Sequence, residues 1–156
     1  IALLKEGKNI ALISDAGTPG ISDPGFVLIR AAISAGIQVV PIPGPSAFLS
    51  ALCVSGLPTD KFLYLGFLPK KKGRKTLIES LREEERTVVS YESPYRILRK
   101  LEELHSRLGD RQVAVCRELT KVFEEIFRGT LSEARSHFKH QTPRGEFVVV
   151  LGGKNR

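Results

Sequence analysis

Two acid–base pairs follow apolar runs of the sequence and could do chemistry. Glu92 and Arg96 come after one such run, and Glu118 and Lys121 come after another. A carboxylate at a strand end can bind a hydroxyl or act as a general base, and an arginine can pair with a phosphate. Glu92 and Glu118 are therefore candidate catalytic residues, and Arg96 is a candidate phosphate ligand. The alternative is structural: Glu92 lies on a solvated edge or in a salt bridge to Arg96, and Glu118 forms a surface ion pair with Lys121.

Two loops rich in glycine and proline, residues 14–25 and 41–47, also follow apolar runs. Glycine has no Cβ and proline pre-sets φ, so a ligand can approach the main chain of such loops. If both runs are strands of a parallel sheet, the loops lie side by side, where open α/β sheets hold their ligands. The first loop has no lysine and matches neither the P-loop nor the dinucleotide fingerprint. The alternative is an ordinary loop of an α/β domain.

A basic cluster stands between Pro69 and an amphipathic helical pattern, and it is a candidate for contacts to the phosphates of a nucleic acid such as RNA. Its members are Lys70, Lys71, Lys72, Arg74 and Lys75. Clustered cations neutralise phosphates and release counterions. Only Tyr64 and Phe67 are aromatic neighbours in the sequence, which favours backbone contacts over base readout. The alternative is a solvated, mobile loop.

Strand-like and helix-like runs alternate along the chain, which is typical of an α/β fold. The expected strands are 9–14, 37–41, 62–68, 86–91, 112–117, 123–129 and 146–151, and the expected helices are 24–35, 46–55, 73–84, 94–107 and 131–138. Ser46 and Ser93 are expected to cap helices at their N-termini. The pattern breaks near residue 58, which predicts an N-terminal domain over 1–57 and a C-terminal domain over 58–156.

Composition limits the class of protein. The formal net charge of +7 suits an anionic partner without identifying it as RNA. No apolar run is long enough to cross a membrane and no signal-peptide pattern is visible, which favours a cytoplasmic protein. Cys53 and Cys116 lie in apolar runs without metal spacing and are expected to be reduced, buried thiols. His105, His137 and His140 have no partner at metal spacing, so we expect surface histidines and no metal.

Five ordered motifs resemble the tetrapyrrole methylase family. They are residues 14–25, Pro43-Gly-Pro-Ser-Ala47, Tyr91-Glu-Ser-Pro-Tyr-Arg96, Arg117-Glu-Leu-Thr-Lys121 and Pro143-Arg-Gly-Glu-Phe147, and they extend over nearly the whole chain. Within the family they are similar to the ribosomal RNA small-subunit methyltransferase I branch. Family members begin with a further strand, an Ala-Thr-Pro-Ile-Gly-Asn type loop and an acidic Glu-Asp-Thr-Arg segment. The chain is therefore expected to be a fragment with a truncated N-terminal domain.

The resemblance implies two α/β domains with a methyl-donor cleft between them. It implies S-adenosylmethionine-dependent 2′-O-methylation of a cytidine in 16S ribosomal RNA, by a homodimer that acts on the RNA or on the ribosomal particle. The implied donor contacts are Asp15, Ala16, Gly17, Thr18, Pro19, Ser46, Ala47, Leu119, Thr120, Pro143 and Gly145. Glu118 or Lys121 is expected to touch the substrate ribose, and Lys121 to bind RNA.

The implied chemistry needs positioning more than a metal. A sulfonium methyl is already electrophilic, so the enzyme must align the ribose 2′-oxygen with it and remove a poorly acidic proton. Glu92 and Glu118 are the candidate bases in this chain, while the Glu-Asp-Thr-Arg segment of the family can also supply the base.

Two other functions fit parts of the pattern. A methyltransferase for corrin precursors or another small substrate would share the donor site, but the basic cluster and the Tyr91–Arg96 motif favour RNA. A noncatalytic nucleic-acid-binding module would keep the basic surface and show no saturable donor binding.

Overall fold

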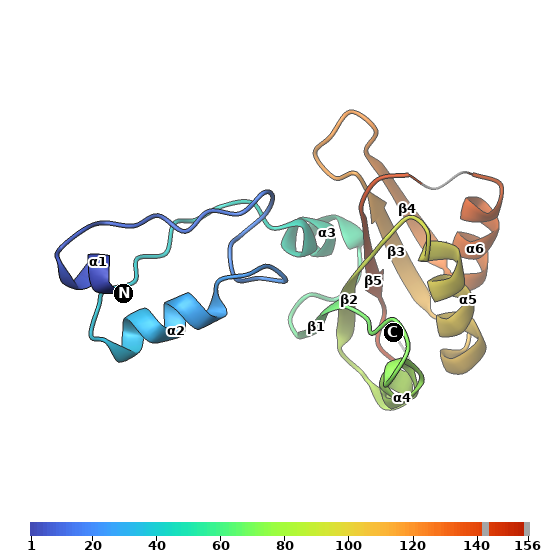
Figure 1. The fold of residues 1–156 in the computed structure, drawn as a ribbon. Helices are drawn as coiled ribbons and strands as arrows, with labels where there is room; N and C mark the ends of the chain where they lie inside the picture. Colours follow the sequence, from blue (N-terminus) through green and yellow to red (C-terminus); the bar gives the residue numbers. More distant parts are fainter. Residues whose placement is uncertain (142–143, 155–156) are drawn as a thin grey trace. The chain divides into compact units, whose positions relative to one another are not determined.

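The computed structural model describes residues 1–141 and 144–154. The chain forms two compact units, Ile1–Ser46 and Ala47–Arg156, which are described separately below (Figure 1). The helix that the sequence places at 46–55 belongs to the second unit, because it packs on the sheet of that unit. The domain boundary after residue 57 stays a prediction.

The first unit contains the helices α1 (Ala2–Lys5) and α2 (Phe26–Ser34), the second of which confirms the helix expected over 24–35. The strands expected at 9–14 and 37–41 are wrong for this structure, since the described residues of both segments pair with no strand. A strand is stable only when a neighbour satisfies its backbone groups and covers its apolar face. Ile13 accordingly has 84% of its surface exposed.

The second unit is built on a mixed five-stranded sheet in the order β1-β2-β5-β3-β4. Its strands are β1 (Phe62–Phe67), β2 (Thr87–Glu92), β3 (Gln112–Arg117), β4 (Glu125–Thr130) and β5 (Phe147–Leu151). The β1–β2 pair is parallel, and the β2–β5, β5–β3 and β3–β4 pairs are antiparallel. The expected strands of this unit are confirmed to within two residues, and the fold is α/β as expected.

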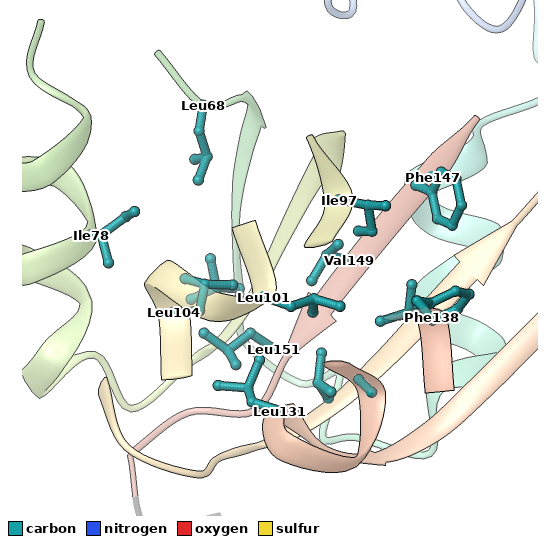
Figure 2. Close-up of a cluster of buried hydrophobic side chains, with 14 of the residues drawn as sticks. Leu68, Ile78, Ile97, Leu101, Leu104, Leu131, Phe138, Phe147, Val149 and Leu151 are labelled. Atoms are coloured by element: carbon teal, nitrogen blue, oxygen red, sulfur yellow. The ribbon is translucent and has the colours of Figure 1, made fainter. Parts of the chain in front are cut away.

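Helices cover both faces of this sheet. One face carries α3 (Ala47–Ser55), and the other carries α4 (Arg74–Ser80), a 3-10 turn (Leu81–Glu83), α5 (Ile97–Leu108) and α6 (Leu131–Lys139). Alternate strand residues face opposite sides: Val149 packs with the α5 and α6 side chains, as Figure 2 shows, while Val148 and Val150 pack with α3.

The start of α5 differs from the expectation. Ser93 does not cap the helix, because residues 94–96 form a turn in which the Arg96 amide donates to the Ser93 carbonyl (3.1 Å), and α5 begins at Ile97. The helix starts later because Arg96 has a non-helical φ of −124° and its side chain is bound by Glu92 and Ser93. Glu92 and Arg96 are thereby separated by a turn, which allows them to face each other.

Among the described residues, every helix is too short or too polar to cross a bilayer. In the same part of the chain, no three His, Cys, Asp or Glu residues gather as a metal site requires.

Candidate active site

The two glycine-rich loops meet within the first unit. Thr18 Oγ1 in the first loop donates a hydrogen bond to the carbonyl of Pro45 in the second (2.8 Å). Ser14 Oγ donates to the carbonyl of Ala16 (3.2 Å), which holds the first turn of its loop. The loops are thus adjacent, as the sequence suggested, although no parallel strands precede them in this structure.

An open hollow of about 820 Å³ lies beside the first loop, and Leu12, Ser14, Asp15 and Gly25 contribute to its lining. This volume falls in the range of small-molecule sites. Gly25 has a φ of 149°, and a Cβ at this position would lie 3.0 Å from Leu12 Cδ2. Only glycine therefore allows this close packing between the loop and the start of α2.

The expected donor contacts have different surroundings. The exposed ones are Asp15, Ala16, Gly17, Ala47 and Thr120. The half-buried ones are Thr18, Pro19, Ser46, Leu119 and Gly145. Ser46 is the last residue of the first unit and Ala47 the first of the second. Pro143 lies outside the described residues.

The topology brings the other expected site segments to one end of the sheet. We call this the loop end: it comprises the carboxyl ends of β1, β2 and β3 and the amino ends of β4 and β5. Arg117 of β3 pairs with both Phe147 of β5 and Glu125 of β4, and Glu92 of β2 also pairs with Phe147. The β3–β4 loop and the segment before β5 therefore lie beside the end of β2.

Glu118 and Lys121 form the ion pair that the sequence left open as the alternative. Lys121 Nζ lies 3.0 Å from Glu118 Oε1 and 2.9 Å from Glu146 Oε2. The Glu146 amide donates to Glu118 Oε1 (2.8 Å). This backbone hydrogen bond, followed by that from Lys121, holds the pKa of Glu118 below its usual value. A carboxylate that is stabilised in this way is a weak proton acceptor near neutral pH.

The backbone of this loop is strained. Glu118 and Thr120 have φ values of 47° and 65°, which residues other than glycine rarely adopt. The Thr120 amide donates to Glu124 Oε2 (2.6 Å). Gly145 leaves room for the Glu118 side chain, because a Cβ at Gly145 would lie 2.5 Å from Glu118 Cδ. Such strain collects at functional sites, where the surroundings enforce it.

Glu92 lies in a buried ionic cluster rather than on a solvated edge. Its side chain is fully buried, with Arg96 Nη2 2.9 Å from Oε1 and Arg74 Nη1 3.8 Å from Oε2. The Ser93 amide also donates to Oε1 (2.9 Å). Arg74 is bound on its other side by Glu103, with Nε 2.5 Å from Oε2. The salt bridge to Arg96 that the sequence allowed is thus present, in a dry setting.

Lys100 of α5 completes this ionic cluster. It is fully buried, and its Nζ donates to Ser90 Oγ (2.7 Å) and to the Tyr91 carbonyl (3.1 Å). Burial lowers the pKa of Lys100 to about 7, while Glu92 opposes this shift. The ammonium group therefore fastens α5 to the end of β2, just before the Tyr91–Arg96 motif.

The basic cluster divides in the structure. Lys70, Lys71, Lys72 and Lys75 are exposed, but Arg74 is 95% buried and is held by Glu103 and the Pro69 carbonyl (3.3 Å). The expectation of five exposed cations is therefore wrong at Arg74. The reason is that Arg74 starts α4 on its inner side, where its charge faces two carboxylates.

Two side chains of the sheet, Tyr91 and Cys116, keep their protons at neutral pH. Burial, with a smaller contribution from Tyr64, raises the pKa of Tyr91 to about 12. Burial also raises the pKa of the Cys116 thiol to about 11, in line with the expected buried thiol. The expectation for Cys53 is wrong, since Cys53 is exposed while its neighbour Leu52 faces the sheet.

Sequence reasoning missed the roles of Lys100 and Glu103. A signal for Lys100 was present, because Ile97, Lys100, Leu101 and Leu104 follow the spacing of one buried helix face. A lysine inside such an apolar stripe indicates a buried charge that needs a partner. Nothing in the local sequence distinguishes Glu103 from the other exposed-looking carboxylates of this helix.

Comparisons with known proteins agree with the motifs. The chain is 51% identical over 154 residues to a ribosomal RNA small subunit methyltransferase I of Thermotoga maritima, covering 99% of this chain and 69% of that protein. It is 51% identical to the protein of the same name from Synechocystis, covering 98% of this chain and 56% of that one. The chain thus spans little more than half the length of most of these relatives.

Solved structures share the fold at low identity. The methyltransferase CobJ matches 98% of this chain and 68% of its own with a TM-score of 0.69 and 23% identity. A uroporphyrin-III C-methyltransferase from Thermus thermophilus matches 87% of this chain and 62% of its own, with a TM-score of 0.56 and 19% identity. The model of the Tetrapyrrole (Corrin/Porphyrin) Methylases matches residues 1–135, so the chain belongs to the tetrapyrrole methylase family.

Proposed function

We propose that the chain is part of an S-adenosylmethionine-dependent enzyme that methylates the 2′-oxygen of a cytidine in 16S ribosomal RNA. The observation that carries this proposal is the identity of about half of all residues, across almost the whole chain, with proteins named ribosomal RNA small subunit methyltransferase I. We further propose, from the family resemblance, that the enzyme is a homodimer and works in the cytoplasm on ribosomal RNA or on the small ribosomal particle.

From the family resemblance we propose a methyl-donor cleft between two α/β domains, to which the two glycine-rich loops and the loop end of the sheet contribute. The hydrogen bond from Thr18 to Pro45 and the adjoining hollow support a ligand at the first of these places. The strained backbone at Glu118 and Thr120, with Gly145 close to the Glu118 side chain, supports main-chain contacts at the second. The solved Thermus enzyme complexed with S-adenosyl homocysteine has the same fold.

The chemistry assigns different tasks to the two carboxylates. When bound, S-adenosylmethionine supplies an electrophilic methyl group. Glu118 lies in the loop with Leu119 and Thr120 and is partly exposed, so its ionised carboxylate can accept a hydrogen bond from the 2′-hydroxyl and orient it. Glu92 has no exposed side-chain surface and acts by holding Arg96 and the turn that precedes α5.

Donor binding is the first test. Titration calorimetry with S-adenosylmethionine should show saturable binding, and Thr18→Val should weaken it about 3- to 10-fold because the bond between the two loops is lost. Thr76→Val, on the exposed side of α4, is the matched control and should bind like the wild type. Absence of donor binding by the wild type, or equal affinities in wild type and Thr18→Val, would contradict this site.

RNA binding is the second test, and Arg74 must be left intact because it is part of the buried cluster. Replacing Lys70, Lys71 and Lys72 by glutamine should weaken binding to small-subunit RNA and reduce the slope of log K against log salt by about 2, since each lost phosphate contact removes about 0.7 to 0.9. Donor affinity should not change. Lys75, Arg96 and Lys121 are further proposed RNA contacts.

A control variant that loses the same three positive charges elsewhere distinguishes the loss of local phosphate contacts from the change in net charge. Lys61, Arg82 and Arg86 lie near the amino ends of β1 and β2, at the opposite end of the sheet, and are exposed. Their replacement by glutamine should leave the salt slope close to that of the wild type. If both triple variants behave alike, the basic loop has no specific role in RNA binding.

A further inference from the structure

Exposed aromatic side chains from distant parts of the sequence gather at the loop end of the sheet. Tyr95 follows β2 and is 95% exposed, Phe123 precedes β4 and is 74% exposed, and Phe67 ends β1 and is 54% exposed. The strand pairing puts all three segments at this end. The sequence had shown little aromatic interleaving near the basic loop, because only the sheet brings these residues together.

The turn that carries Tyr95 is fixed from within. Arg96 Nε donates to Ser93 Oγ (3.1 Å), and Arg96 Nη2 binds the buried Glu92 carboxylate at 2.9 Å. The Ser93 amide donates to the same carboxylate. Tyr95 therefore stands exposed on a rigid support, so its ring loses little freedom when it contacts a ligand.

The loop that carries Phe123 is fixed in a similar way. The Lys121 amide donates to the Glu118 carbonyl (3.0 Å), and the Glu124 amide donates to the Lys121 carbonyl (3.1 Å). Glu124 in turn accepts from the Thr120 amide. These bonds brace the loop on both sides of Phe123, whose side chain is exposed to solvent.

Charge at the loop end favours a polyanion. The carboxylates of Glu92, Glu118 and Glu146 are engaged by Arg96 and Lys121. In the described part of the chain, by contrast, no carboxylate lies within 4.0 Å of the amino groups of residues 70–72. The three lysines after β1 thus supply unneutralised positive charge at the same end of the sheet as the aromatic residues.

From this juxtaposition the geometry points to a binding surface for single-stranded RNA, on which Tyr95 and Phe123 stack against bases and residues 70–72 hold phosphates. A strand spacing of about 4.8 Å puts the ends of the two outer strands about 19 Å apart, a span for several nucleotides. Stacking needs bases that are free of a duplex, so the substrate is an unpaired segment. The inference rests on the proposed function for the choice of RNA as the ligand. It adds the residues that contact the bases and the phosphates.

The test measures RNA affinity of the 156-residue chain by fluorescence anisotropy. The probes are a cytidine-containing 12-nucleotide single strand and a duplex of the same sequence. Tyr95→Ala and Phe123→Ala should each weaken binding of the single strand about 10-fold, the order of one base–aromatic stack, and should leave duplex binding and the salt slope unchanged. Tyr95→Phe should restore affinity to within about twofold, because it keeps the ring.

Val122→Ala is the matched control, since Val122 is exposed next to Phe123 but has no ring. The inference is overturned if this control loses as much affinity as Phe123→Ala, if both alanine variants bind like the wild type, or if single strand and duplex lose affinity equally. It is also overturned if the variants change only self-association in sedimentation, because the surface is then a protein contact.

The outcome is separable from that of the proposed function. Donor binding and methyl transfer are measured on the same preparations. Loss of single-strand affinity in the variants, without donor binding by the wild type, supports the RNA surface and contradicts methylation. If the wild type binds the donor and transfers the methyl group while the alanine variants keep their single-strand affinity, methylation is supported and the RNA surface is contradicted.

Discussion

Replacing Glu92 by alanine is expected to lower the free energy of unfolding by about 3–5 kcal/mol, the cost of breaking a buried ion pair. The carboxylate is fully buried and is the counter-ion of Arg96 and Arg74. Without it, the Arg74 guanidinium and the Lys100 ammonium stay buried, and Arg96 stays partly buried, with Glu103 as the remaining nearby carboxylate. The variant therefore loses attraction while it keeps most of the desolvation cost.

Urea unfolding followed by far-ultraviolet circular dichroism measures this effect, since the chain has no tryptophan to report on the transition. Glu102→Ala is the matched control from the same region of sequence: its ion pair with Arg135 (2.6 Å) is about half exposed and should contribute about 0–1 kcal/mol. Equal stability losses for the two variants would show that burial of the Glu92 cluster has no special energetic weight.

Lys100 is expected to make stability rise with pH between about 7 and 9. Its pKa is about 7 in the folded protein, where it is buried, and 10.5 in the unfolded chain, where it is solvated. Between these values the unfolded chain therefore binds more protons than the folded protein. Deprotonation then favours the folded state by up to about 1.4 kcal/mol for each pH unit. The charged groups that face Lys100 are Glu92, which opposes the shift, and Arg74 and Arg96, which add to it.

The measurement is the urea midpoint of wild type and Lys100→Met from pH 7 to 9. The rise should be present in the wild type and absent in the variant, whereas Lys75→Met, which removes an exposed lysine, should keep it. Above pH 9 the raised pKa values of Cys116 and Tyr91 act in the opposite direction, because the folded state then holds the extra protons. A slope that is unchanged in Lys100→Met would assign the pH dependence to other groups.

The elements of the second unit could be predicted because their patterns are local. Residues 112–117 and 146–151 are short apolar runs that contain valine, and α5 repeats its apolar residues at helical spacing. The strands expected at 9–14 and 37–41 have equally apolar sequences but no partner strand in the described chain. Periodicity reports which residues are apolar, and it does not report whether a neighbour is there to cover them.

The sequence by itself determined the family, the strands and helices of the sheet unit and the identity of the ionisable residues near the site. Only the tertiary structure decided what those residues touch: Arg74 turns inward to Glu103 and Glu92, and Lys100 spans from α5 to Tyr91. It also decided that Tyr95 and Phe123 share one end of the sheet. The physical reason is that burial and ion pairing depend on strand order, which joins segments that the sequence keeps far apart.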